Sequence, residues 1–404
     1  MKRARLASAL LLACALPAAP QDNTPEPPPA VEQPAQTPAP LVLRELLVVQ
    51  ADRYDDTANN PKLQGTALPA AINKVGREKR VDSSEQYDYQ PMPLGVLTFS
   101  GEIKEPMKVR IKLNADVSRF QAYFPDEDAI IGKQLLGWDT VRGANEKQQP
   151  ESFGDQGGWL ASLRDSEDRV WLQSRDPLRK ERFLMYDASF KYKPVIDLSF
   201  SGDQYKLKTT APEQAAPPLC ILVRKGDAGW SSDTLSAPWP QPTPIIAQKA
   251  ADKSGLPELA QALGPLKALL EQRGYNKQEV RLAFDMIGAA GFDKPGMSLV
   301  YVLPVGVIDE HIKLSITPKP DEVIRTAIIV VNNVDPGLGS QVKALIADLG
   351  SDQWIKRDRA QRELTSLGQA AIKQVQPLKN SKDPEIAFRA RQILNVYDWK
   401  MNNR

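Results

Sequence analysis

The chain has 404 residues, enough for two or three folded domains. Its 52 Lys and Arg nearly balance its 50 Asp and Glu, so the overall charge implies neither a strongly acidic nor a strongly basic partner. One His and two Cys are too few for a His-rich metal site, a Cys/His zinc module or an iron–sulfur cluster. We therefore predict no metal and no cofactor.

Residues 1–19 have the pattern of a secretory signal peptide. Lys2, Arg3 and Arg5 precede an apolar run from Leu6 to Leu16. This run is far shorter than the roughly 20 apolar residues that span a bilayer. We expect an exported protein, periplasmic or anchored in the cell envelope, that has no transmembrane helix.

The segment Leu11-Leu12-Ala13-Cys14 resembles the lipobox of bacterial lipoproteins. The resemblance implies that Cys14 is diacylated and becomes the mature N-terminus, the only link to a membrane that we expect. The alternative is ordinary cleavage after Ala15 or Ala18, which leaves no lipid. In both cases residues 20–40, of which 8 are Pro, predict a disordered tether because this composition cannot bury a core.

Residues 41–93 begin with one apolar segment and then turn polar, which predicts an extended lead-in. From residue 94 to 230 apolar and polar residues alternate, as where Arg110 separates Val109 from Ile111. About eight short strands in this range predict an antiparallel β-sandwich domain. Two hairpins are expected within it, with turns at 165–168 and at 201–204.

A Pro-rich linker is predicted at 231–250, followed by a small α+β domain at 251–335. Its first helix, with Leu at intervals of three and four residues, is expected to end at Gly274. Asn276 is expected to cap the second helix. Two strands, at 298–303 and 323–332, complete this unit.

The helical spacing of apolar residues continues from 336 to 404. The segments 348–354, 359–368 and 382–394 resemble HEAT-type repeats of bacterial exported proteins, with Asp383 as a cap and Pro384 at the first helical position. The resemblance covers about residues 340–400 and implies paired antiparallel helices that bind other macromolecules. Because this is only about one and a half repeats, we expect a cap on the preceding domain instead of a free solenoid.

Arginines of this helical segment are candidates for a basic face that binds a partner. From residue 341 onward there are 12 Lys and Arg against 7 Asp and Glu. The alternative is that these arginines line solvated helix faces. The candidates are Arg357, Arg359, Arg362, Arg389 and Arg391.

The sequence contains none of the common catalytic or nucleotide-binding motifs. His311 would be a general base if Asp309 oriented it, although a polar turn explains it equally well. Ser340 is expected to be a helix N-cap. The acidic run 126–128 suggests either a calcium site, a glycosidase carboxylate pair or an acidic turn.

Aromatic residues of the expected β-sandwich suggest a second kind of binding. Trp159 and Trp171 are candidates for stacking on sugars, and the alternative is that they are core residues. We expect an exported, non-enzymatic envelope protein that binds a protein partner through its helical end, and no nucleic acid. A carbohydrate-binding protein and a hydrolase with a carboxylate pair are the alternatives.

Overall fold

The computed structural model describes most of the chain from residue 39 to residue 402. The predicted signal peptide with Cys14, the predicted tether up to residue 38, and the acidic run 126–128 lie outside the described residues. The described ranges are 39–53, 57–58, 62–64, 73–74, 89–91, 94–114, 118–125, 129–131, 134–144, 158–174, 180–201, 204–209, 216–226, 229–235, 242–244, 256–290 and 296–402.

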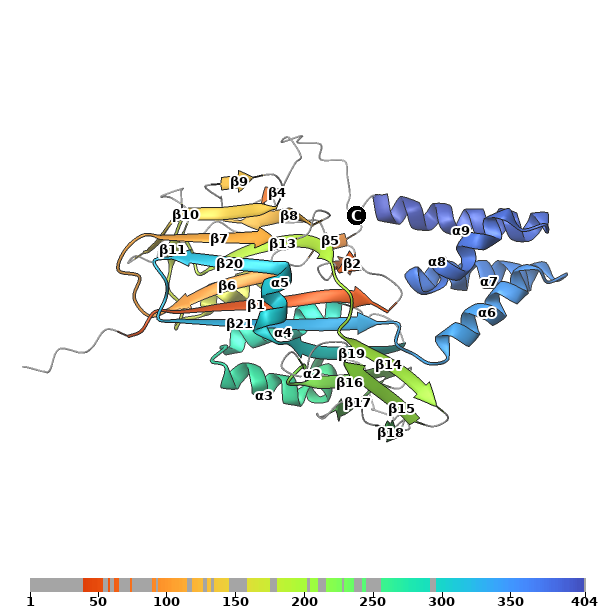
Figure 1. Ribbon diagram of the computed structural model, residues 1–404, viewed down its shortest axis with the longest axis horizontal. Coiled ribbons are helices and arrows are strands. Elements are labelled where there is room, and N and C mark those ends of the chain that lie inside the picture. The colour runs from red at the N-terminus through yellow and green to blue at the C-terminus, as the bar shows by residue number, and fades with distance from the viewer. Residues whose placement is uncertain are drawn as a thin grey trace, which may run out of the picture. The chain divides into compact units, whose positions relative to one another are not determined.

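A large mixed β-sheet forms the middle layer of the fold (Figure 1). Its main strands, in spatial order, are β17 (Gly229–Leu235), β16 (Cys220–Gly226), β19 (Gly296–Leu303), β21 (Glu322–Asn332), β1 (Val42–Asp52), β6 (Gly95–Ser100), β13 (Phe183–Lys191) and β8 (Arg119–Phe124). Two short strands extend it, β4 (Asn73–Lys74) beside β8 and β2 (Thr57–Ala58) beside β13. Neighbours pair antiparallel, except that β1 and β21 are parallel along 11 residues each.

A smaller antiparallel sheet packs on one face of the large sheet. Its strands are β20 (Ile312–Thr317), β7 (Met107–Leu113), β10 (Leu135–Gly143), β11 (Leu172–Gln173) and β12 (Lys180–Glu181), with β9 (Ala129–Ile131) beside β10. Two further groups are small: β14 (Ile196–Ser201), β15 (Gln204–Thr209) and β18 (Pro242–Pro244) in one, and β3 (Lys62–Gln64) with β5 (Tyr89–Pro91) in the other. The hairpin predicted with its turn at 201–204 is confirmed as β14–β15.

Short helices cover the opposite face of the large sheet. They are α1 (Gly158–Ala161), α2 (Leu256–Ala262), α3 (Gly264–Gln272) and α4 (Lys277–Ala289), while α5 (Val305–His311) leads into β20. Strand β1 shows how the layers are built, because Leu43 and Leu47 join the core with the small sheet whereas Leu46 and Val48 join the core with the helices. A strand buried on both faces tends to be continuously apolar, as β1 is from Leu46 to Val49.

The chain ends in helices with a core of their own. They are α6 (Leu338–Leu349), α7 (Trp354–Leu367), α8 (Gln369–Val375), a 3₁₀ turn at Gln376–Asn380, and α9 (Pro384–Asn402). Their buried side chains include Val342, Leu364 and Ile393. The helical character predicted for this region is confirmed. In the described part of the chain, no helix combines the length and the apolar character needed to cross a membrane.

The expected fold class, a β-sandwich followed by an α+β unit and helices, is confirmed in part. Two sheets do pack face to face, but the larger one is mixed, and its strands come from the expected lead-in (β1), from 94–230 and from 251–335 alike. Period-two patterns indicate strands without revealing partners, and β1 pairs with a strand 280 residues later. The structure is therefore a mixed α/β fold followed by helices.

Three local expectations are also corrected. The hairpin expected around 165–168 is absent, because 158–165 forms α1 and a 3₁₀ turn whose Leu160 and Leu163 pack under the helices. The helix expected to run unbroken to Gly274 is split into α2 and α3 at Leu263, because Pro265 in the first turn of α3 lacks an N–H for the helical ladder. Ser340 lies inside the first turn of α6, whose N-cap is Gly337.

Candidate functional site

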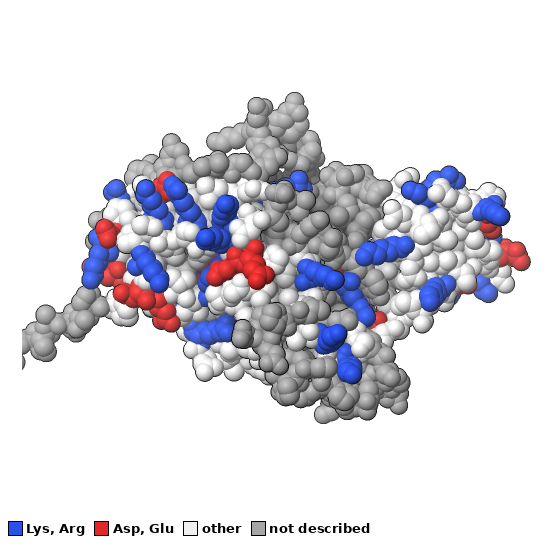
Figure 2. All heavy atoms as spheres, in the orientation of Figure 1, with Lys and Arg blue, Asp and Glu red and all other residues white. Residues whose placement is uncertain are grey.

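The outer face of the small sheet carries a row of basic side chains. Residues of β7 alternate between buried and solvent-facing, so that Lys108, Arg110 and Lys112 point away from the core. In the neighbouring β20, Lys313 lies directly opposite Lys112. Figure 2 shows Lys and Arg gathered over the part of the molecule where Figure 1 places β7, β10 and β20.

These side chains surround a hollow of about 370 Å³. None of the lining residues is acidic, and two of them, Ser315 and Thr317, offer hydroxyl groups. The complete lining is Lys108, Arg110, Lys112, Leu135, Lys313, Ser315 and Thr317. We call this surface the basic sheet face.

At the border of the basic sheet face, an arginine of β7 binds a carboxylate of β10. Arg110 donates from Nε and Nη2 to the two carboxylate oxygens of Asp139, each at 3.0 Å. This hydrogen bonding lowers the pKa of Asp139 and raises that of Arg110. Asp139 thus neutralises Arg110, while Lys112 and Lys313 have no ion pair within the described residues.

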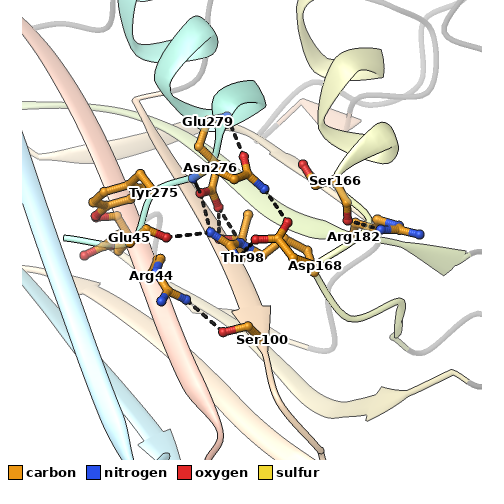
Figure 3. A network of polar contacts seen from close by, with 12 residues as sticks. Arg44, Glu45, Thr98, Ser100, Ser166, Asp168, Arg182, Tyr275, Asn276 and Glu279 are labelled. Atoms are coloured by element: carbon orange, nitrogen blue, oxygen red, sulfur yellow. Dashed lines mark hydrogen bonds and ion pairs between the residues drawn. The ribbon is translucent and has the colours of Figure 1, made fainter. Parts of the chain in front are cut away.

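A buried ion pair fixes the start of α4 to the large sheet (Figure 3). Arg169 donates from Nε and Nη2 to the two oxygens of Glu279, at 2.8 and 2.6 Å, and both side chains are 2% exposed. Thr98 of β6 also donates to Glu279. Burial alone would lower the pKa of Arg169, yet the bonds to Glu279 raise it.

The same carboxylate completes the N-terminal cap of α4. The side chain of Asn276 accepts from the Glu279 backbone N–H at 3.0 Å, and Glu279 accepts from the Asn276 N–H at 2.8 Å. This capping box confirms the predicted cap. Since both carboxylate oxygens of Glu279 accept hydrogen bonds within the protein, this cluster supports the fold.

A second buried network crosses the parallel pair of strands. Glu45 of β1 accepts from Arg325 of β21 and from the hydroxyl of Tyr186 at 2.8 Å, and Arg325 also binds the carboxylate of Asp309. Burial raises the pKa of Tyr186, so the phenol remains a donor. The charges are satisfied internally, which again indicates a structural role.

This network removes the orienting partner proposed for His311. The Asp309 carboxylate binds Arg325, and the ring of His311 lies against Tyr192 with centroids 5.6 Å apart. Burial lowers the pKa of His311, against an opposing effect of Glu310. The carboxylate considered as a partner for His311 is therefore held by Arg325.

In the C-terminal helices, α7 and α9 lie side by side and run parallel. Arg357 of α7 binds Glu385 of α9 at 3.1 Å, and one turn later the side-chain amide of Gln361 meets Arg389 and Gln392, each at 2.7 Å. Both helices therefore advance in the same direction along this contact. Beside it, Trp354 and Phe388 are 64% and 53% exposed.

Most of the arginines predicted to form a basic face are engaged within the helices. Arg357 and Arg389 both bind Glu385, and Arg359 binds Asp348 at 3.1 Å. Arg362 pairs with Asp358 at 3.0 Å on α7. Arg391 is exposed and has no ion pair among the described residues. Four of the five thus balance carboxylates of their own module, an arrangement that matches solvated helix faces.

The structure describes the side chain of one of the two tryptophans proposed to stack on sugars. The backbone of Trp159 belongs to α1, and its side chain lies outside the described part of the structure. The guanidinium of Arg182 covers the ring of Trp171 at 4.7 Å from the centroid. Trp138 is fully buried between the sheets, where its indole N–H donates to the Pro125 carbonyl at 3.0 Å.

Sequence reasoning missed the basic sheet face although part of the signal was present. The alternation of Arg110 and Lys112 with apolar residues indicated a strand with a basic outer face. The contribution of Lys313 was hidden, because the segment before Pro318 was not recognised as a strand beside β7. Comparison of the sequence with protein-family models and with curated proteins finds no match.

Proposed function

We propose that this protein is an exported, non-enzymatic protein of the cell envelope that binds another protein through its C-terminal helices, residues 338–402 (the helical module). The observation that carries the proposal is the exposure of Trp354 and Phe388 beside the contact between α7 and α9. Export rests on the sequence pattern of residues 1–19.

The internal repetition of the module supports its similarity to HEAT repeats. Ser351 and Ser381, 30 residues apart, each accept a hydrogen bond from the N–H two positions later, just before α7 and α9. Ala360 and Ala390, with the same separation, are both fully buried. Parallel packing of α7 and α9 is what equivalent helices of consecutive repeats would give.

The two exposed aromatic side chains flank one ion pair. Trp354 lies three residues before Arg357 on α7, and Phe388 lies three residues after Glu385 on α9. Residues three apart are neighbours on a helix face, so both rings adjoin the Arg357–Glu385 contact. Aromatic side chains framed by charges are typical centres of protein–protein interfaces. The partner we propose is an apolar segment of another exported protein.

Site-specific crosslinking in the producing cells tests this proposal. A photoreactive residue replacing Phe388 is expected to crosslink one exported protein, and the same residue at Lys343, exposed on α6, is not. The identified partner is then purified and titrated with the full chain. Trp354→Ala with Phe388→Ala is expected to weaken this complex at least tenfold, because hot-spot aromatics dominate interface energy.

Equal crosslinking from position 343, or unchanged affinity of the double variant, would overturn the proposal. Both substituted side chains are more than half exposed, so the variants are expected to fold normally. A circular dichroism melt of each variant checks this.

A further inference from the structure

The basic sheet face holds basic side chains in a regular array, in which Asp139 offsets the charge of Arg110 and the lysines supply the net positive charge. Lys108, Arg110 and Lys112 occupy alternate positions of β7, which places successive side chains about 7 Å apart along the strand. Lys313 of β20 widens the array at one end. An extended chain with repeated negative charges would match this spacing.

Two lysines that lie directly opposite each other in this array repel, which lowers the stability of the folded protein when no anion is bound. The Cβ atoms of directly opposite residues in antiparallel strands lie about 5 Å apart, and like charges in such pairs destabilise a sheet. Lys112 and Lys313 form such a pair. An anion bound between the two ammonium groups would remove this repulsion, so binding should stabilise the folded protein.

Other features of the hollow favour a hydrated, hydroxyl-rich ligand. Ser315 and Thr317 can bond to hydroxyl, carboxylate or phosphate oxygens of a ligand held by the lysines. Each lies opposite a basic residue of β7, Ser315 opposite Arg110 and Thr317 opposite Lys108. At these two positions a charged group of β7 therefore faces a hydroxyl group of β20.

The composition of the surface argues against a membrane and against single-stranded nucleic acid. No exposed large apolar side chain among the described residues lies on β7, β10 or β20, whereas peripheral membrane binding needs apolar anchors besides charge. The hollow has no aromatic lining residue, and single strands are bound largely by stacking on aromatic rings.

We infer that the basic sheet face binds an acidic polysaccharide, whose carboxylates pair with Lys112 and Lys313 and whose hydroxyls bond to Ser315 and Thr317. This site is formed by strands and shares no residue with the aromatic pair of the helical module. The Trp354→Ala, Phe388→Ala variant should therefore bind the polysaccharide normally. Failure of either proposal is thus distinguishable from failure of the other.

Titration of the full chain with oligogalacturonate at low salt tests the inference. Binding should weaken steeply as NaCl is added, and Lys112→Gln with Lys313→Gln should reduce the affinity by about tenfold or more. The matched control is Lys206→Gln with Lys208→Gln, two exposed lysines of β15, which should bind like the unaltered protein.

Thermal unfolding gives an independent readout that also reports on folding. Without ligand, the Lys112→Gln, Lys313→Gln variant should melt at the same temperature as the unaltered protein or above it, because a like-charge pair has been removed. Oligogalacturonate should raise the melting temperature of the unaltered protein and leave that of the variant unchanged.

Three results would overturn the inference. One is equal affinity of the lysine variant and the unaltered protein for oligogalacturonate. Another is equal binding of neutral dextran. The third is tighter binding of phosphatidylglycerol vesicles, or of a single-stranded oligonucleotide, than of oligogalacturonate. Tighter binding of the vesicles would identify the surface as a membrane-binding site, and tighter binding of the oligonucleotide would identify it as a nucleic-acid-binding site.

Discussion

Glu279 and Arg169 show how single residues accommodate charge inside this protein. Each is almost fully buried, and each makes several hydrogen bonds that fix its position. The capping role of Glu279 follows from its place three residues after Asn276. Its pairing with Arg169, 110 residues earlier, is set by the tertiary fold.

Replacing Glu279 by Ala should lower the free energy of unfolding by about 3–5 kcal/mol, because Arg169 would lose its buried counter-charge and keep only the exposed carboxylate of Asp168. Urea denaturation measures the change. Arg281→Ala on the same helix is the control, since this side chain is 74% exposed and its pair with Asp285 should contribute less than about 0.5 kcal/mol. Similar losses in the two variants would contradict a special role for the buried pair.

At the scale of secondary structure, the break between α3 and α4 depends on Gly274. This residue has a φ of +75°, which residues with a Cβ rarely adopt. A Cβ placed there would also lie 2.8 Å from Nη2 of Arg44. The sequence indicated this helix end correctly, because glycine commonly ends helices.

Gly274→Ala should therefore destabilise the protein by about 1–2 kcal/mol, through the left-handed backbone and the contact with Arg44. Gly339→Ala, in the first turn of α6, should leave stability unchanged or slightly raised, since a Cβ there meets nothing within 4 Å apart from its chain neighbours and the backbone of its own helix. Thermal unfolding of both variants distinguishes the two sites. An equal loss in both would refute the conformational argument.

At the scale of the whole fold, stability depends on the contact between the two sheets. The shared core contains Leu43 and Leu47 of β1, Val109 and Ile111 of β7, and Trp138 of β10. The strands of the large sheet come from widely separated parts of the chain. The composition of these segments does not indicate which of them pair in the sheet.

Trp138→Phe should lower the free energy of unfolding by about 2–3 kcal/mol, because it leaves a cavity between the sheets and removes the donor to the Pro125 carbonyl. Trp354→Phe, at a 64% exposed side chain, should change it by less than about 0.5 kcal/mol. Denaturant titration followed by circular dichroism measures both. A loss at Trp354 as large as that at Trp138 would count against this account of the core.

The sequence by itself determined the local features of this protein. The helices after residue 338, the cap at Asn276, the end of a helix at Gly274, and the β14–β15 hairpin depend on residues close together in the chain. The exported character remains a prediction from residues 1–19.

Only the tertiary structure decided which distant segments of the chain are in contact. It made β1 an interior strand, tied Asp309 to Arg325 instead of His311, and placed Lys313 beside Lys112. These contacts join residues that are far apart in the chain. The pairing of such segments is selected by the burial of both faces of the sheet that they form together. Alternation and helical periodicity specify which face of an element is buried, and they carry no information about which distant element covers it.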